Sequence, residues 1–198
     1  MSPRSITRRA WLRGAGVSLA SAPYLSGTVI DLSPTAFMGH AQAGQGWGGV
    51  VLQASEGESL ITGRRRARLS IKVDSARVAA LPMSMVVSEV DPGATIPVHR
   101  HTYEDELIFI HTGEGVVTLG EREVAVTAGA MLYGPRAIWH GVRNTGSVIL
   151  TWCAIYSPAG FEQFFKETGS APATSAPAPT PAQLAAAAVK YGLVFRDP

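Results

Sequence analysis

Short runs in which apolar and polar residues alternate follow one another along the middle of the chain. Gly, Pro, Asp and Asn separate them, and they lie at 50–53, 67–73, 83–90, 95–101, 106–112, 115–120, 123–129, 130–134, 139–144 and 147–157. Alternation with a period of two is typical of strands that bury one face. Because no long helical segments stand between the runs, the pattern predicts an all-β fold, either an antiparallel sandwich or a barrel.

A first helix is predicted directly after the last strand. It begins near Pro158, and Phe161, Phe164 and Phe165 form an apolar stripe on one side of it. Gly169 is expected to end this helix, because glycine is common just beyond a helix C-terminus.

A second helix is predicted after a linker. Residues 170–181 are rich in Pro, Ala and Ser and indicate a flexible, partly extended linker. Thr180 is followed by a proline and, three positions on, by Gln183, which is the spacing of a capping box. The helix is therefore expected to run from this point to Tyr191 and to end at Gly192.

The N-terminal segment resembles a twin-arginine export signal. Arg8 and Arg9 precede an uncharged run of apolar and small residues at 14–30. Ala41 and Ala43 provide small residues at the two positions that signal peptidase needs, so the mature chain is expected to begin at Gly44. The resemblance implies export by the twin-arginine machinery to the periplasm or beyond. The alternative is a basic, disordered N-terminus.

Composition divides the chain and excludes some functions. The expected parts are a signal peptide at 1–43, a β-barrel at 44–157 and a helical tail with its Pro/Ala-rich linker at 158–198.

The net charge of +2 comes from arginines near the N-terminus, and the basic cluster at 64–68 has no interleaved aromatics, so no nucleic-acid surface is predicted. Cys153 is the only cysteine, which excludes an intramolecular disulfide and predicts a buried small apolar side chain.

Four residues form the candidate chemical site. His99 and His101 are two apart on a predicted strand, so both imidazoles point to the same face. Glu106 begins the next apolar run and can face back across a hairpin, and His140 begins a later strand after a Gly-Pro turn. An isolated His-x-His pair is weak evidence by itself, and the two further residues strengthen it.

Residues around these four also recur at fixed spacings. They are Gly93, Gly113, Gly129, Pro135 and Asn144. Together with the four candidates they resemble the two signature motifs of the cupin superfamily, except that Ala137 stands where the family usually has glycine. The resemblance implies a cupin fold, which is a jelly-roll-like antiparallel β-barrel, here followed by short C-terminal helices. It also implies turn-forming roles for the glycines and Asn144, and metal ligation by His99, His101, Glu106 and His140.

The ligand types restrict the metal. Three imidazoles and one carboxylate suit a single divalent transition metal, namely Fe, Mn, Ni, Co or Cu, and the residues do not choose among these. Because the set contains no thiolate, a structural zinc site is not expected.

Neighbouring residues receive simpler interpretations. Glu104 and Asp105 are interpreted as solvated turn acids, and His111 is expected on the opposite face from Glu106. Five aromatic residues are expected to belong to the barrel, with some lining any cavity near the metal: Tyr103, Phe109, Tyr133, Trp139 and Trp152.

A wider resemblance runs from about residue 50 to the C-terminus. The order of motifs, with the "SPAGFEQFF" segment at 157–165, is similar to single-cupin proteins of the quercetin 2,3-dioxygenase type. This similarity implies a dioxygenase that cleaves a flavonol or another phenolic or enol substrate with O2, in which Glu106 accepts the hydroxyl proton. A homodimer is expected by analogy.

Two other function classes stay open. One is a periplasmic cupin that binds a small molecule without turnover, and the other is a metal-dependent lyase or isomerase. A shared fold does not choose among them, because cupins serve many chemistries.

Overall fold

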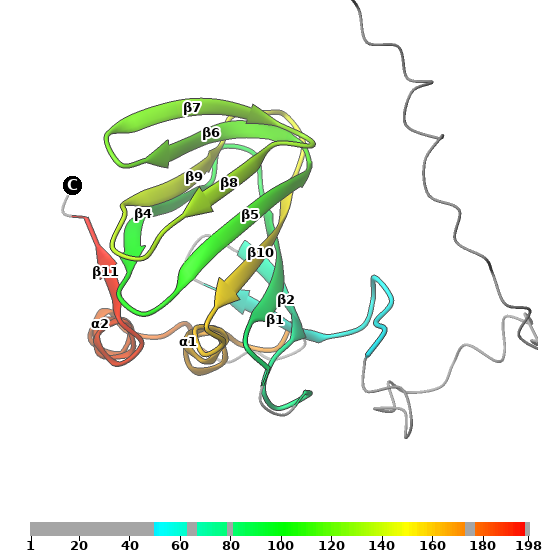
Figure 1. The fold of residues 1–198 in the computed structure, drawn as a ribbon, viewed down its shortest axis with the longest axis vertical. Coiled ribbons are helices and arrows are strands. Elements are labelled where there is room, and N and C mark those ends of the chain that lie inside the picture. Colours follow the sequence, from blue (N-terminus) through cyan, green and yellow to red (C-terminus); the bar gives the residue numbers. More distant parts are fainter. Residues whose placement is uncertain (1–49, 63–66, 79–80, 173–176, 197–198) are drawn as a thin grey trace, which may run out of the picture. The chain divides into compact units, whose positions relative to one another are not determined.

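Two antiparallel β-sheets and two short helices form the part of the chain that the structure describes (Figure 1). The structure is a computed structural model, and it describes residues 50–62, 67–78, 81–172 and 177–196. The expected export signal and its cleavage position lie outside these residues. Within them, none of the helices has the length and apolar character needed to cross a membrane.

The larger sheet has six strands in the order β1-β2-β3-β10-β5-β8, and every neighbouring pair is antiparallel. Its strands are β1 (Glu58–Thr62), β2 (Ala67–Val73), β3 (Ser84–Val90), β10 (Leu150–Ser157), β5 (Asp105–Thr112) and β8 (Met131–Gly134). β10 lies between β3 and β5, so the last strand of this sheet pairs with strands that precede it by many residues.

The smaller sheet has five strands in the order β11-β4-β9-β6-β7, and its pairs are also antiparallel. Its strands are β11 (Leu193–Phe195), β4 (Thr95–His101), β9 (His140–Asn144), β6 (Glu114–Leu119) and β7 (Arg122–Thr127). The predicted all-β antiparallel fold is therefore confirmed.

Alternating burial builds the core between the sheets. Along β3 and β10 every second residue is buried, as the period-two pattern predicts. Val86, Leu150 and Ala154 have no exposed surface. Full burial of a side chain such as valine or leucine contributes about 1.5–3 kcal/mol, so these positions fix which face of each strand points inward.

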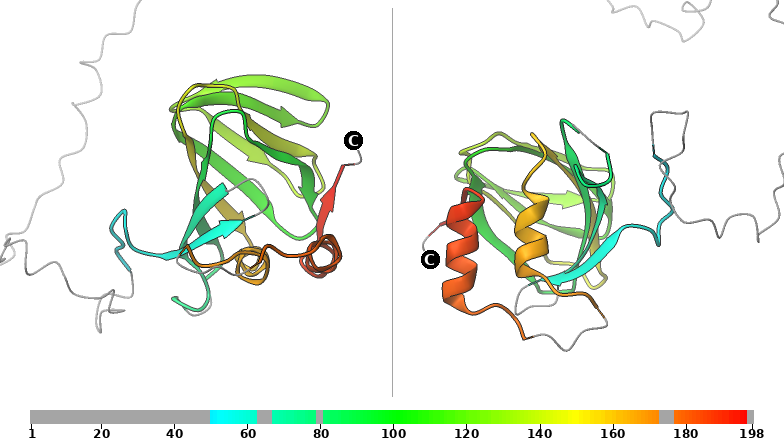
Figure 2. Two further views of the ribbon diagram at one scale, coloured as in Figure 1. Left: turned by 180° about the vertical axis from the view of Figure 1, so that it is seen from behind. Right: turned by 90° about the horizontal axis from the view of Figure 1, so that it is seen from below.

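Two short helices cover one end of the sheets, where they contact each other (Figure 2). Helix α1 (Glu162–Thr168) starts a few residues later than expected, and the backbone N–H of Gly169 donates to the carbonyl of Phe165 at its end. Helix α2 (Pro181–Lys190) has the predicted capping box: the N–H of Gln183 donates to the Thr180 hydroxyl, and the Gln183 side chain accepts from the Thr180 N–H.

Three local predictions are wrong. The run at 50–53 is not a strand, and the first strand is instead Glu58–Thr62, which buries Leu60 alone. The tail is not purely helical, because β11 pairs with β4. Cys153 is only half-buried, because it lies on the outer face of β10 between buried Trp152 and Ala154.

The predicted turn formers have the backbone that their motif requires. Gly93, Gly113 and Gly129 all have positive φ, and a Cβ on Gly113 would lie 2.8 Å from the carbonyl oxygen of Ile149. The buried Asn144 amide donates to the carbonyls of Val90 and Val148, at 2.8 Å each.

Candidate metal centre

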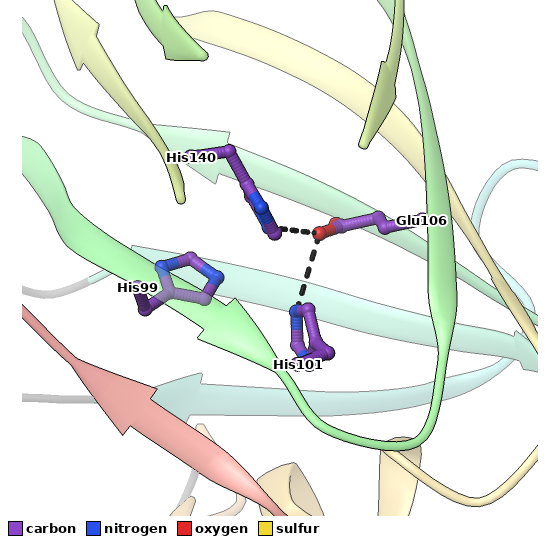
Figure 3. Close-up of side chains that lie close together, drawn as sticks. All are labelled: His99, His101, Glu106 and His140. Carbon is purple, nitrogen blue, oxygen red and sulfur yellow. Dashed lines mark hydrogen bonds and ion pairs between the residues drawn. The ribbon is translucent and has the colours of Figure 1, made fainter. Parts of the chain in front are cut away.

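The four candidate residues converge on one point (Figure 3). His99 and His101 project from β4, Glu106 from the start of β5, and His140 from the first position of β9. One ligand atom from each residue lies within 4.8 Å of the others. His101, Glu106 and His140 are almost completely buried. The four side chains could therefore hold a metal ion.

Backbone carbonyls orient two of the imidazoles. Nδ1 of His99 lies 2.7 Å from the carbonyl oxygen of Pro97, and Nδ1 of His140 lies 2.9 Å from that of Ile138. A carbonyl oxygen only accepts hydrogen bonds, so Nδ1 must carry the hydrogen in both rings. This leaves Nε2 of each ring with a lone pair, which is the form that ligates metals.

The contact between His140 and Glu106 requires a cation. Nε2 of His140 lies 2.8 Å from Oε2 of Glu106. A neutral His140 with its hydrogen on Nδ1 has only a lone pair at Nε2, and an ionised carboxylate also offers only lone pairs. The two atoms attract each other only when a second proton or a metal ion lies between them. The donor set therefore fits a bound cation.

Burial and mutual charge set the ionisation of these groups. Burial and the charges that His140 and His101 would carry lower the pKa of His99 to about 3, so this ring is neutral at pH 7. Burial opposes ionisation of Glu106, but the adjacent imidazoles of His101 and His140 hold the pKa of Glu106 well below its usual range. Burial likewise opposes protonation of His140, but Glu106 raises the pKa of His140 overall. Metal binding would displace this proton from His140.

An apolar cavity adjoins the centre. Its volume is about 670 Å³, and His99, Glu106 and His140 line it. Side chains from both sheets, α1 and α2 form the rest of the wall, and the larger apolar ones are Leu69, Ile96, Ile108, Trp152, Tyr156, Phe161, Phe164, Phe165, Leu184, Leu193 and Phe195. The arrangement allows a small molecule to place an oxygen atom at the metal and an apolar body in the cavity.

Aromatic side chains from the C-terminal part of the chain pack on the centre. The ring of Phe161 meets that of His101 edge-on, with 4.2 Å between the ring centroids. The centroid of the Tyr156 ring lies 5.6 Å from that of His101. Burial, followed by the charge of Glu106, raises the pKa of Tyr156 well above its ordinary value, so its hydroxyl keeps its proton. The sequence showed the three-phenylalanine stripe near α1, but not that it reaches the histidines.

The prediction for Glu104 is wrong. The residue is 5% exposed, and its Oε2 lies 3.9 Å from Nδ1 of His101. Burial raises the pKa of Glu104, and the neighbouring His101 is the largest opposing influence. Asp105 is partly exposed, as expected for a turn acid, and it pairs with Arg136, whose Nε lies 3.1 Å from Oδ1.

His111 and the five aromatic residues expected in the barrel differ in their burial. His111 is exposed on the opposite face of β5 from Glu106, as predicted. Of the five aromatics expected in the barrel, Trp152 is buried and lines the cavity, and Trp139 is half-buried under Arg100 and Arg196. The other three are exposed on the outside, namely Tyr103, Phe109 and Tyr133.

A comparison with protein families agrees with this geometry. Residues 86–156 match the model of the cupin domain family, and all four candidate ligands lie within this range. Among curated proteins, the chain is similar to an oxalate-binding protein from Thermotoga maritima, with 30% identity over 67 residues. The match covers 34% of this chain, which spans only 55% of the length of that relative.

A solved structure has a similar fold. A crystal structure of a predicted oxalate decarboxylase from Thermotoga maritima superimposes with a TM-score of 0.50 at 22% identity, over 55% of this chain and 98% of the other. An RmlC-like cupin from Shewanella frigidimarina has a TM-score of 0.47 at 19% identity, over 55% and 89% of the two chains. The family match and the fold together support the cupin superfamily for this part of the chain.

Proposed function

We propose that this chain is a metal-dependent cupin enzyme, exported by the twin-arginine machinery, that cleaves a flavonol or another phenolic or enol substrate with O2. One observation carries the proposal: the donors of His99, Glu106 and His140 open onto an apolar cavity of about 670 Å³. Cavities of roughly 300–1,000 Å³ hold ligands the size of drug molecules. An aromatic substrate with an oxygen at one end suits such a cavity better than a small, fully polar one.

A divalent transition metal held by the four residues would supply a Lewis acid and a position for a substrate oxygen. The chain itself supplies the proton acceptor. Glu106 is ionised at neutral pH, because its pKa lies well below the usual range. The hydroxyls of enols and phenols are more acidic than those of alcohols, so a substrate of this class suits a carboxylate as proton acceptor.

The walls of the cavity supply orientation and exclude water. Trp152, Tyr156 and Phe161 are each 5% exposed or less, and they present aromatic surface to the cavity. Such surface stacks on aromatic substrates and keeps solvent away from a reactive centre. The protonated Tyr156 hydroxyl is a hydrogen-bond donor in the same wall.

Binding without turnover is the second candidate function. Similarity to a protein named for oxalate binding favours it, although that similarity covers 34% of this chain. In this case the same four residues would hold a metal that captures a small anion. The cavity argues against the second candidate, because oxalate would leave most of an apolar volume of about 670 Å³ unfilled.

Oxygen consumption tests the proposal. The chain would be loaded in turn with Fe(II), Mn(II), Co(II), Ni(II) or Cu(II) and mixed with a panel of flavonols, simple phenols and oxalate. Substrate-dependent O2 uptake with at least one metal is expected from a flavonol or phenol. Tight binding of oxalate without O2 uptake would favour the binding function, and product formed without O2 uptake would identify a lyase or isomerase.

A further inference from the structure

His101 differs from the other two histidines of the centre in how its ring is held. His99 and His140 each bond through Nδ1 to a carbonyl two residues earlier. Among the described residues, neither ring nitrogen of His101 has a hydrogen-bond partner, although His101 is 1% exposed. Nε2 lies 3.3 Å from Oε2 of Glu106, so Nδ1 points away from the centre. A group on the far side of the ring must therefore accept the Nδ1 hydrogen.

Glu104 lies on this far side. Its Oε2 lies 3.9 Å from Nδ1 of His101, and this oxygen is also buried without a hydrogen-bond partner among the described residues. A second buried acid nearby, Glu162, has its own partners: its carboxylate accepts from the N–H of Gly160 at 2.8 Å and from the Gln163 amide at 3.4 Å. Glu104 is thus the acceptor that remains for His101.

We propose that Glu104 is a positioning residue for His101, and that its carboxylate accepts the Nδ1 hydrogen so that Nε2 is presented to the metal. The inference rests on the metal-binding part of the proposed function. A histidine ligand commonly donates its second N–H to a carboxylate, which fixes the tautomer and the orientation of the ring. Removal of such a partner typically lowers metal affinity by about 10- to 100-fold.

Packing around His101 and around the loop that carries Glu104 keeps the two side chains close to each other. Phe161 covers one side of the His101 ring, with 4.2 Å between centroids, so the ring cannot turn towards α1. The loop that carries Glu104 is fastened by a hydrogen bond of 2.8 Å from the N–H of Thr102 to the carbonyl of Gly192. The 3.9 Å separation exceeds a hydrogen bond, and contacts of this kind are often long in sites without ligands.

Metal titration of three proteins tests the proposal: wild type, Glu104→Gln and Glu104→Leu, each with Co(II) and with Zn(II) alone. Glu104→Leu removes the acceptor at similar size, so its affinity for both metals should fall by about 10- to 100-fold. Glu104→Gln keeps a carbonyl oxygen that can accept from Nδ1, so it should recover part of this loss. Equal affinity of Glu104→Leu and wild type would overturn the proposal.

Two control variants separate positioning from general damage. Asp105→Asn removes a neighbouring acid that faces Arg136 instead, and Glu162→Gln removes the other buried acid. Both should bind Co(II) within about twofold of wild type, since neither faces His101. A loss in Glu162→Gln as large as that in Glu104→Leu would show a general effect of buried charge and would contradict the proposal.

Proton NMR of the Zn(II)-loaded protein provides a readout that does not depend on activity. In wild type, the Nδ1 hydrogen of His101 should give a downfield resonance that exchanges slowly with water, and Glu104→Gln should change it. Its absence in wild type would overturn the proposal even if Glu104→Leu did not fold. Failure of wild type to bind any metal would instead overturn the proposed function, and O2 uptake is measured separately.

Discussion

The backbone N–H of Ala137 donates to the carbonyl of His101 at 2.7 Å, and Ala137 has a φ of 65°. Within the described part of the chain, it is the one non-glycine residue with positive φ. The bond joins the turn before β9 to the end of β4, so it holds His140 and His101 in fixed relation. The family's usual glycine at this position would adopt the same backbone without strain.

Replacement of Ala137 by glycine should stabilise the fold. The left-handed conformation costs alanine about 1–2 kcal/mol, and glycine avoids this cost. Glycine loses more conformational freedom on folding than alanine does, which offsets roughly 0.5–1 kcal/mol of the gain. The free energy of unfolding of Ala137→Gly should therefore rise by up to about 1.5 kcal/mol in urea titrations. Ala125→Gly, in strand β7, is the matched control and should lower it. A less stable Ala137→Gly protein would contradict the interpretation.

Glu106→Gln should separate metal binding from turnover. The amide keeps the size of the side chain and one oxygen, but it removes the negative charge and the proton acceptor. Some metal should remain on the three histidines, while O2 uptake falls by about 10²-fold or more if the carboxylate is a general base. Metal analysis and O2 uptake would be measured on the same samples. Asp105→Asn is the control, and full activity in Glu106→Gln would remove the proposed role.

Lys166 should stabilise the fold in a pH-dependent way. Its ammonium lies 2.7 Å from Asp74, which is 4% exposed, and 2.9 Å from Glu58. Lys166→Met leaves Asp74 without this partner and should lower the free energy of unfolding by about 1–3 kcal/mol at pH 7. Lys190→Met, which breaks an exposed pair with Glu167, should cost less than about 1 kcal/mol.

The sign of the pH effect follows from the shift in the pKa of Asp74. Burial opposes ionisation of Asp74, but the hydrogen bond from Lys166 lowers the pKa of Asp74 below its unfolded value of 3.8 overall. The ionised Asp74 therefore contributes to the free energy of unfolding above pH 3.8, and this contribution is lost as the pH falls through the lowered pKa of the folded state. The difference between wild type and Lys166→Met should shrink in acid, as urea titrations at pH 7 and pH 3 would reveal. An unchanged difference at pH 3 would contradict the assignment.

Export should depend on the paired arginines. Arg8→Lys combined with Arg9→Lys should leave the precursor in the cytoplasm, because the twin-arginine machinery reads the arginine pair. Cell fractionation followed by immunoblotting measures the distribution. Unchanged export of the double variant would show that another route carries the protein.

The fold was predictable wherever the alternation was strong. Strands such as β3 and β10 bury every second side chain, so their period is visible in the sequence. β1 buries only Leu60, and β11 has three residues, so neither has enough positions to show a period. Their positions depend on partner strands, and local sequence does not report these.

The centre was predictable from spacing, but its surroundings were not. His99, His101, Glu106 and His140 lie in recurring motifs, and the structure brings them together. The burial of Glu104 depends on packing by the segment that leads into α1, more than 50 residues further along the chain. A turn acid covered in this way has the same local sequence as a solvated one.

The four residues of the centre do not come from one sheet. Glu106 belongs to the six-stranded sheet, whereas the three histidines belong to the five-stranded sheet. A metal bound by all four would act as a cross-link between the layers and would oppose breathing motions that separate them. Amide hydrogens of β5 and of β9 would then exchange with solvent more slowly when the metal is present, and the two strands would slow by a similar factor.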